Sequence, residues 1–512
     1  MNDAPTKSLG PRTKIYGLSF IGGVLHFLGW AGFGIWPLAL VCMVPLLAAL
    51  ELGLDRGWRH SLAVGWLYGV VSYAGGYHWL VEFLEVFSGY GLALSALIFF
   101  LFCVYLGFDY AIYAVLYRAL RTRGWSTAAI AVPVLLLMEW GYPALFPTYL
   151  ANSLHMLTWP IQIADLGGPL LVTALIGAIN LTIYETWQWR KKRRAAPTWL
   201  WGITTAAVLS ATAYGAIRVR QIEARIADAP VLRLGIVQVN MGIFDKWEEA
   251  LEGHRRHLEQ SHELEDEGEL DLLVWPESAI VRSLSRKLPW NGDRIRRDLE
   301  TPILFGGVST DEVDGERRVY NTVFAMDADG MVRSTYDKTY LLMFGEYLPF
   351  GETFPILYEL SPNSGRFTKG SHVRPVILGE WRISTPVCYE DILARFTRKM
   401  VREAKPHLMI NLTNDAWFGD TQEPAIHLLL SKYRAIEHRR YLVRSTNSGI
   451  SAVIDPLGRV VAQSGLLTRE NLRADVHMLE EDTIYTMLGD WPGWLSLLAV
   501  GWMLIVRRSV GR

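Results

Sequence analysis

The stretch D-L-L-V-W-P-E, residues 271–277, places an acid directly after a short and continuously apolar segment. Such a run is typical of a buried strand, and Pro276 ends it because proline cannot donate to a strand ladder. Glu277 therefore stands at the end of a predicted strand, where a carboxylate can be presented to a site. The alternative is a surface carboxylate after a proline turn, which the adjoining apolar strand disfavours.

Strands and helices alternate on both sides of this stretch. We predict strands at 231–240, 271–275, 303–310, 319–326, 331–337, 382–387, 407–412, 441–445 and 450–455, and helices at 248–266 and 422–440. The pair Asp329-Gly330 is typical of a hairpin turn. Strands interleaved with helices predict a layered α/β or α+β domain.

The N-terminal part of the chain has a different composition. Half of all residues are hydrophobic, and 20 are Trp. A membrane-spanning helix needs about 20 mostly apolar residues. Candidate spans are 15–30, 33–50, 61–80, 91–117, 127–146, 168–187 and 198–218, with an eighth at 493–507. We therefore expect a helical membrane domain at 1–219, an outer α/β domain at 220–490, and an eighth span with a short tail at 491–512.

Basic residues predict the orientation of these spans. They cluster at 7–14, 56–60, 118–123, 190–194 and 507–512. Eight spans put all five clusters on one side of the membrane, whereas seven or nine would divide them. Because basic residues mark the cytoplasmic side, residues 220–490 are expected on the other side, the periplasmic face of a bacterial inner membrane.

Charge and cysteine usage exclude several classes of function. The formal net charge of −1 gives no electrostatic case for nucleic-acid binding. Of the three cysteines, only Cys388 lies in the outer domain, so a disulfide within that domain is excluded. No C-x-x-C motif is present, and we predict neither a metal nor a cofactor. The N-terminal apolar run continues into further spans, which is not the pattern of a cleaved signal peptide.

Glu139 lies inside the predicted span 127–146. An ionisable group there is costly and normally faces the interior of a helix bundle. It either contacts a lipid or an amine, or it is a hydrogen-bonded structural carboxylate. We favour the second interpretation.

Two more chemical groups follow predicted strands. Lys338 belongs to D-K-T-Y at 337–340, and Cys388 belongs to P-V-C-Y-E at 386–390. Acyl transfer through a thioester needs a thiolate, a proton carrier and a group that stabilises an oxyanion. Cys388, Glu277 and Lys338 could supply these in turn. The alternatives are a buried structural cysteine and a solvated lysine on a hairpin.

These motifs, in this order, resemble the nitrilase or carbon–nitrogen hydrolase superfamily. Together with G-E-Y-L-P-F-G-E at 345–352, N-D-A-W-F-G at 414–419 and the membrane spans, they resemble the apolipoprotein N-acyltransferases. The resemblance implies an α-β-β-α sandwich and a Glu277–Lys338–Cys388 triad.

The resemblance also implies roles for residues around the triad. Glu346 would lie beside the triad and Glu390 behind the nucleophile, although either could instead be a structural ion-pair partner. The backbone N–H of Tyr389 would help Lys338 to stabilise the oxyanion, and Trp247 would lie on an arm over the pocket.

Aromatic residues of the outer domain have two interpretations. Trp417 is either a pocket residue or an interfacial anchor. The stretch 341–362, which contains Phe344 and Phe350, is rich in apolar residues without a clean helical or strand period. It is either a lid that dips toward the bilayer or a loop folded onto the domain core.

By this resemblance, a phospholipid, expected to be phosphatidylethanolamine, acylates Cys388. The acyl chain then passes to the α-amino group of a diacylglyceryl-cysteine at the N-terminus of a lipoprotein. One alternative is a membrane-tethered amidase that uses water as acceptor, and seven preceding spans disfavour it. Another is a catalytically dead scaffold or transporter that binds lipoproteins, and the complete triad disfavours it.

Overall fold

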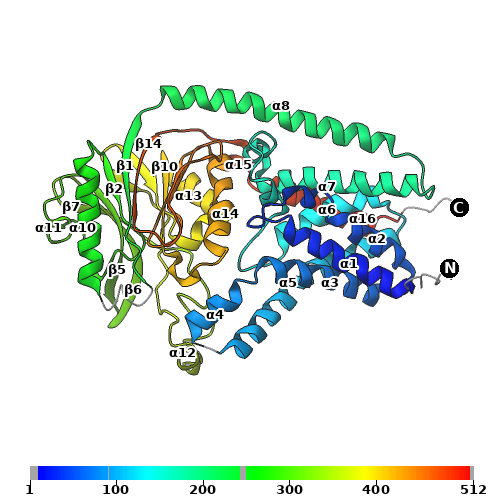
Figure 1. Cartoon of the computed structure of the whole chain (residues 1–512), viewed down its shortest axis with the longest axis horizontal. Helices are drawn as coiled ribbons and strands as arrows, with labels where there is room; N and C mark the ends of the chain where they lie inside the picture. Colours follow the sequence, from blue (N-terminus) through cyan, green and yellow to red (C-terminus); the bar gives the residue numbers. More distant parts are fainter. Residues whose placement is uncertain (1–9, 90, 243–248, 508–512) are drawn as a thin grey trace, which may run out of the picture.

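The computed structural model describes residues 10–89, 91–242 and 249–507. It consists of a helical bundle and a layered α/β domain, with the chain passing from one to the other after helix α8 (Figure 1). The last helix, α16, returns to the bundle. The interleaved strands and helices of the second part confirm the predicted α/β class.

The bundle contains helices of very different length. They are α1 (Pro11–Leu28), α2 (Met43–Leu52), α3 (Trp58–Gly76), α4 (Leu80–Ser88), α5 (Leu92–Arg121), α6 (Thr127–Gly141), α7 (Ala164–Arg190), α8 (Thr198–Asp228) and α16 (Trp491–Ile505). Three helical segments of the described chain are long and apolar enough to cross a membrane: Leu92–Arg121, Pro160–Arg190 and Thr198–Asp228. Large apolar side chains such as Phe100 and Leu101 are exposed on α5, as expected of a face that meets lipid.

Two predicted spans differ from the structure. The span predicted at 33–50 is broken into a 3₁₀ turn (Trp36–Leu40) and α2, because Pro37 starts a new turn after two glycines with positive φ. The span predicted at 61–80 ends at Gly76, and the sequence analysis missed α4. A Cβ atom at Gly76 would lie 1.8 Å from the Trp30 ring, so this position allows only glycine.

Glu139 is a structural carboxylate in this fold. Its Oε1 accepts a hydrogen bond from the Leu150 N–H at 2.8 Å, and its Oε2 accepts one from the Thr173 hydroxyl at 2.8 Å. Both oxygens are therefore used to hold the turn after α6 against α7.

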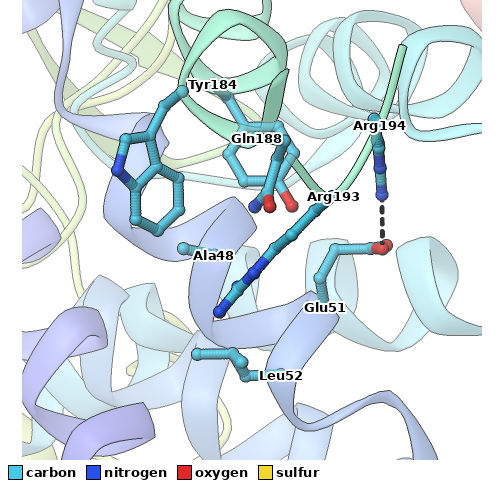
Figure 2. Close-up of a pocket in the computed structure, with 8 residues that line it drawn as sticks. Ala48, Glu51, Leu52, Tyr184, Gln188, Arg193 and Arg194 are labelled. Atoms are coloured by element: carbon cyan, nitrogen blue, oxygen red, sulfur yellow. Dashed lines mark hydrogen bonds and ion pairs between the residues drawn. The ribbon is translucent and has the colours of Figure 1, made fainter. Parts of the chain in front are cut away.

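The connection from α7 to α8, which contains the basic run 190–194, lies at the end of the bundle remote from the sheets (Figure 1). Arg121 Nε and Arg194 NH2 lie 2.6 and 2.8 Å from the two carboxylate oxygens of Glu51. Figure 2 shows the second of these ion pairs beside a cavity of about 220 Å³. Arg123 donates to the carbonyl of Leu504 at the end of α16. Two widely separated basic segments, 118–123 and 190–194, thus meet at the same end, next to the end of α16.

The α/β domain contains two mixed sheets. The first has the order β14-β1-β2-β5-β6-β7-β4, with β3 paired to β5. Its strands are β1 (Val231–Gln238), β2 (Leu272–Val274), β3 (Ile280–Ser285), β4 (Trp290–Asn291), β5 (Ile303–Val313), β6 (Glu316–Met326), β7 (Met331–Asp337) and β14 (Glu470–His477). The second has the order β13-β12-β11-β10-β9-β8. Its strands are β8 (Val376–Leu378), β9 (Trp381–Ser384), β10 (Leu408–Thr413), β11 (Leu442–Thr446), β12 (Ala452–Ile454) and β13 (Val460–Gln463).

The two sheets pack face to face with helices outside them (Figure 1). Fully buried residues of both sheets, among them Ile236, Val274, Ile410 and Val443, form one apolar cluster. Helix α10 (Ala250–Asp266) covers the first sheet. Helices α13 (Ala394–Ala404) and α14 (Glu423–His438) cover the second, and α14 also contacts α7 of the bundle. This order of layers brings the second sheet and its helices close to the membrane helices.

Two details of the strand prediction have a physical explanation. The predicted strand 382–387 ends at Ser384, because Pro386 lacks the N–H needed to continue the ladder, and only an isolated bridge joins Val387 to Leu412. The hairpin at Asp329-Gly330 is confirmed by antiparallel pairing of β6 with β7 and a φ of 80° at Gly330.

Candidate functional site

Glu277, Lys338 and Glu346 meet at one buried point. Lys338 Nζ lies 2.8 Å from Glu346 Oε2 and 3.9 Å from Glu277 Oε1. The Asn321 side-chain amide joins the two acids, because it donates to Glu277 Oε1 at 2.6 Å and to Glu346 Oε1 at 3.1 Å. The ends of β2 and β7, strand β6 and the loop after β7 thus bring together two carboxylates, an amide and a cation.

Lys338 keeps its charge although it is only 2% exposed. Burial by itself would lower its pKa, but Glu346, Cys388 and Glu277 outweigh burial and hold the pKa above its ordinary value. The alternative of a solvated lysine is therefore wrong. A desolvated and permanently charged ammonium group is suited to stabilising negative charge that develops beside it.

Cys388 begins a single 3₁₀ turn (Cys388–Ile392) and has a φ of 51°. A left-handed conformation is unfavourable for a residue with a Cβ atom and is found most often at functional sites. Asn411 holds this turn, since its amide donates to the Cys388 carbonyl at 2.9 Å and to the Pro386 carbonyl at 3.1 Å. The side chain is exposed enough to react, unlike those of Cys42 and Cys103.

The Cys388 thiol is protonated at neutral pH. Burial is the largest cause that raises its pKa, and Glu277 raises the pKa further, while Lys338 lowers it. Of the charged groups that act on the thiol, Glu277 has the largest effect. Nucleophilic attack therefore needs a base close to the sulfur. Glu277 is the candidate, because it is the charged group with the largest effect on the thiol pKa.

Glu390 connects the lysine segment to the cysteine segment. Its fully buried carboxylate accepts hydrogen bonds from the backbone N–H groups of Thr339, Tyr340 and Val387 at 2.7–2.8 Å, and from the Tyr336 hydroxyl. Burial raises its pKa to about 7. Glu390 thus ties the backbone after Lys338 to the backbone before Cys388.

An apolar pocket opens in front of Cys388 and is built by both parts of the chain. Its free volume is about 30 Å³, roughly the space of one water molecule in the liquid. The walls are mostly aromatic and aliphatic: Tyr77, Trp79, Phe146, Leu342, Tyr389, Ile392, Phe418, Ile426 and Leu430. Because three of these residues come from the helical bundle, the pocket lies where the catalytic domain meets the membrane helices.

The other predicted site residues lie in different places. Tyr389 lines the pocket, and its ring lies 5.8 Å from the Phe146 ring. Trp417 packs against Phe87 of α4, while its neighbour Phe418 lines the pocket. Phe344 and Phe350 are 56% and 75% exposed. The alternative of a loop folded onto the domain core is therefore wrong for these two rings. Trp247 lies outside the described residues.

The sequence analysis missed several residues that shape the site. Asn321 is a polar residue within the mostly apolar predicted strand 319–326, and that contrast could have indicated it. Asn411 gives the same signal in β10. The pocket residues Trp79 and Phe146 had no such signal, because they reach Cys388 only through the packing of two separate domains.

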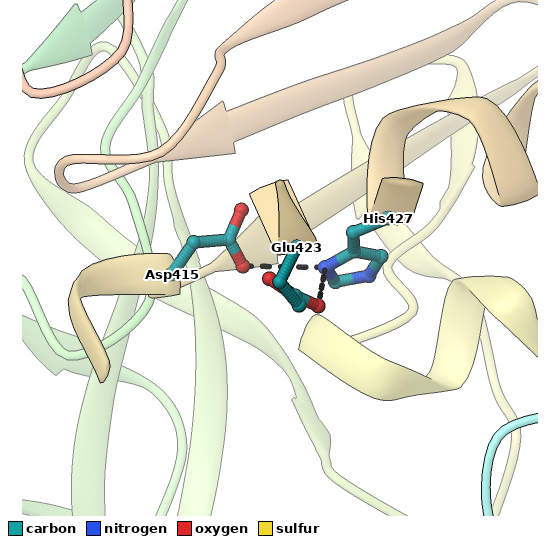
Figure 3. Close-up of side chains that lie close together, drawn as sticks. All are labelled: Asp415, Glu423 and His427. Carbon is teal, nitrogen blue, oxygen red and sulfur yellow. Dashed lines mark hydrogen bonds and ion pairs between the residues drawn. The ribbon is translucent and has the colours of Figure 1, made fainter. Parts of the chain in front are cut away.

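One group of side chains could in principle hold a cation. Asp415, Glu423 and His427 are buried, and one potential ligand atom of each lies within 4.8 Å of the others (Figure 3). However, His427 Nδ1 already lies 3.2 Å from Asp415 Oδ1, and Arg444 NH2 lies 3.6 Å from Asp415 Oδ2. Positively charged side chains thus occupy the positions next to Asp415 that a metal ion would need.

Comparison with known proteins agrees with the geometry. Residues 233–482 match the carbon-nitrogen hydrolase family, and residues 22–182 match the apolipoprotein N-acyltransferase N-terminal domain. An apolipoprotein N-acyltransferase of Geobacter metallireducens is 31% identical, with 94% of this chain and 93% of that protein covered. The chain belongs to the apolipoprotein N-acyltransferase family. The predicted resemblance is thereby confirmed, and the protein is an acyltransferase in a bacterial membrane.

More distant relatives extend the comparison. An apolipoprotein N-acyltransferase of Azotobacter vinelandii is also 31% identical, over 96% of this chain and 95% of that protein. The crystal structure of Nit3 from Saccharomyces cerevisiae, a member of the nitrilase superfamily, covers 50% of this chain and 93% of its own. Its sequence identity is 16% and its TM-score is 0.37.

Proposed function

We propose that this acyltransferase moves a fatty acyl chain from a phospholipid to the α-amino group of a diacylglyceryl-cysteine at the N-terminus of a lipoprotein. Phosphatidylethanolamine is the proposed donor. The observation that carries the proposal is the position of Cys388. It stands between a buried acid–lysine pair and an apolar pocket whose walls include membrane helices. Such a pocket suits a lipid chain better than a small polar amide.

The first half-reaction forms a thioester. Glu277 takes the thiol proton, and the Cys388 sulfur attacks the ester carbonyl of the phospholipid. Lys338 and the backbone N–H of Tyr389 stabilise the oxyanion. The C–O bond then breaks, Glu277 gives its proton to the departing lysophospholipid oxygen, and the acyl chain remains on Cys388.

The two alternative functions, an amidase and a catalytically dead scaffold, would use the same domain differently. An amidase would accept water in the second step and would need no lipid pocket. A dead scaffold would need no charged Lys338 in a site that is costly to build. The test is intact-mass analysis of the purified protein after incubation with phosphatidylethanolamine. We expect an acyl increment that neutral hydroxylamine removes and that a diacylglyceryl-cysteine peptide discharges as an N-acylated product. Absence of the increment, or discharge by water alone at the same rate, contradicts the proposal.

We further propose eight membrane spans, with residues 220–490 in the periplasm and the protein in the inner membrane. The meeting of basic segments at the end of the bundle opposite to the sheets supports this orientation. The proposed domain limits are 1–219, 220–490 and 491–512. Helix α8 continues to Asp228, so the first limit falls within its last turns.

Reporter fusions test the orientation. A reporter that is active only in the periplasm should be active when fused after Thr310 and inactive when fused after Lys192. The reverse pattern would exclude both this topology and a substrate whose modified N-terminus must be reached from outside.

The segment 341–362 is proposed to act as a lid at the bilayer surface. Since the pocket has almost no free volume, an acyl chain requires its walls to move, and Leu342 of this segment is one of those walls. Phe344→Glu and Phe350→Glu should weaken thioester formation from phospholipid, because charge near the bilayer opposes insertion. Their free energy of unfolding should change by less than about 0.5 kcal/mol, as for other surface substitutions.

Thermal unfolding in detergent, measured beside thioester formation, separates the two effects. Val461→Glu is the matched control, since Val461 is also exposed but lies on an edge strand of the second sheet. A large drop in melting temperature for both phenylalanine variants would end the lid proposal.

A further inference from the structure

Glu423 contributes a buried carboxyl group to the Cys388 pocket that the mechanism above does not use. It is the first residue of α14, it is 7% exposed, and it lines the pocket together with Cys388. Its Oε2 atom has no hydrogen-bond partner among the residues that the structure describes. A buried polar atom without a partner is costly, so its position in a pocket indicates that a ligand supplies the partner.

The other charged side chains around Glu423 pair with one another, and Glu423 is the acid that remains outside these pairs. His427 of α14 lies between two acids, with Nε2 2.9 Å from Asp391 Oδ1 and Nδ1 3.2 Å from Asp415 Oδ1 (Figure 3). Arg444 of β11 also pairs with Asp391 and lies 3.6 Å from Asp415. Two cations thus face two acids, and the nearest contact of Glu423 to a cation is 3.9 Å, from Oε1 to His427 Nδ1.

The partner of Glu423 Oε2 is identified by comparing the two substrates that must enter this pocket. The ester carbonyl of the phospholipid carries no cation, and the ammonium group of the ethanolamine head group is separated from it by the phosphate and the glycerol. The acceptor arrives as an α-ammonium group, and its nitrogen must come within bonding distance of the acyl carbon on Cys388. Resting on the proposed function, we infer that Glu423 receives the α-ammonium group of the lipoprotein acceptor and takes one proton from it.

In the second half-reaction, the acyl chain passes from Cys388 to the acceptor, and each proton that moves has a donor and an acceptor. Glu423 takes one proton from the ammonium group, and the neutral nitrogen attacks the thioester carbonyl carbon. Glu277 takes the second proton from the attacking nitrogen and gives it to the Cys388 sulfur as the C–S bond breaks. The N-acylated product leaves, and Glu423 releases its proton to solvent.

The electrostatics suit this exchange. Burial raises the pKa of Glu423 to about 8, and Asp415 adds to the shift, while His427 and Arg444 oppose it. The α-amino group of a free N-terminus has a pKa of about 7.7–8.0. A carboxyl group with this pKa is mostly protonated at pH 7, so Glu423 first releases its own proton to solvent. Because the two pKa values are similar, the one proton that the carboxylate and the amine then share is divided nearly equally between them, and much of the bound amine is the neutral nucleophile. Asp391 also raises the pKa of Glu423, and Cys388, Tyr77 and Tyr389 are further titratable groups that line the same pocket.

The experiment separates the two half-reactions. The full-length protein is loaded with an acyl chain from phosphatidylethanolamine, and discharge by a diacylglyceryl-cysteine peptide is followed in a single turnover. Glu423→Gln should form the thioester at the wild-type rate but discharge it at least about tenfold more slowly at pH 7. The defect should shrink above about pH 9, where solvent deprotonates the amine. Glu423→Asp, which keeps the carboxylate, should recover part of the rate.

Glu82→Gln is the matched control. Glu82 of α4 lines an open groove that shares Trp79 with the Cys388 pocket, but it does not line the pocket itself. This variant should discharge at the wild-type rate. The inference is overturned if Glu423→Gln discharges normally, or if it loses thioester formation in equal measure. It is also overturned if the purified protein holds one metal ion per chain that the variant loses. Failure of the wild-type protein to form any thioester would instead reject the proposed function.

Discussion

Replacing Cys388 by alanine is expected to abolish both the acyl adduct and turnover, with the protein still folded in the membrane. Cys388 is the only cysteine of the outer domain, and its sulfur is the atom proposed to accept the acyl chain. The substitution removes one partly exposed atom and leaves the backbone held by Asn411. The free energy of unfolding should therefore change by less than about 1 kcal/mol.

Intact-mass analysis after incubation with phospholipid measures the result. Cys103→Ala is the matched control, because Cys103 is buried in α5 and should leave the adduct unchanged. An acyl adduct that persists on the Cys388→Ala protein would remove Cys388 as the nucleophile. Loss of the adduct together with a large fall in melting temperature would indicate a structural cysteine instead.

The parts of the fold that the sequence predicts well are those with a strong and continuous pattern. Strands β1, β5 and β10 each contain a run of mostly apolar residues, and their predicted positions agree with the structure to within a few residues. Strands β3, β4, β8, β13 and β14 were missed because they are short or partly exposed and carry a mixed pattern. Helix α4 was missed because it follows closely after an apolar helix, and only residues 77–79 separate the two.

The site was predictable to the extent that it depends on strand ends. Glu277 and Lys338 could be placed there from local sequence, and the family resemblance brought them to Cys388. The charge state of Lys338 could not be predicted, because it depends on Glu346 and Asn321, which approach from separate segments. Glu423 lies in a polar segment at the start of a predicted helix. Its burial follows only from the packing of α14 against the membrane helices.

Removal of the base should be the second large effect. Glu277→Gln keeps the shape of the side chain and its contact with Asn321, but it cannot accept the thiol proton. A positioned base contributes about 10²–10⁴ in rate, and thioester formation should fall by that factor. Glu346→Gln is the matched comparison. Glu346 contacts Lys338 and Asn321, as Glu277 does, but it has less effect on the pKa of Cys388. We expect a smaller loss for Glu346→Gln, and equal losses would remove Glu277 as the base.

The pH dependence of the same variants distinguishes the base from the cation. Glu277 raises the pKa of Cys388, so its removal lowers that pKa toward the ordinary value of a thiol. Residual activity of Glu277→Gln should therefore increase as pH rises and solvent deprotonates the sulfur. Lys338 lowers the thiol pKa, so Lys338→Met should raise it and should also remove the oxyanion partner, a loss of about 10²–10³ in rate. Raising the pH should restore the rate that is lost through the higher thiol pKa. It should not restore the rate that is lost with the oxyanion partner. Turnover within threefold of wild type for either variant at pH 7 would contradict these roles.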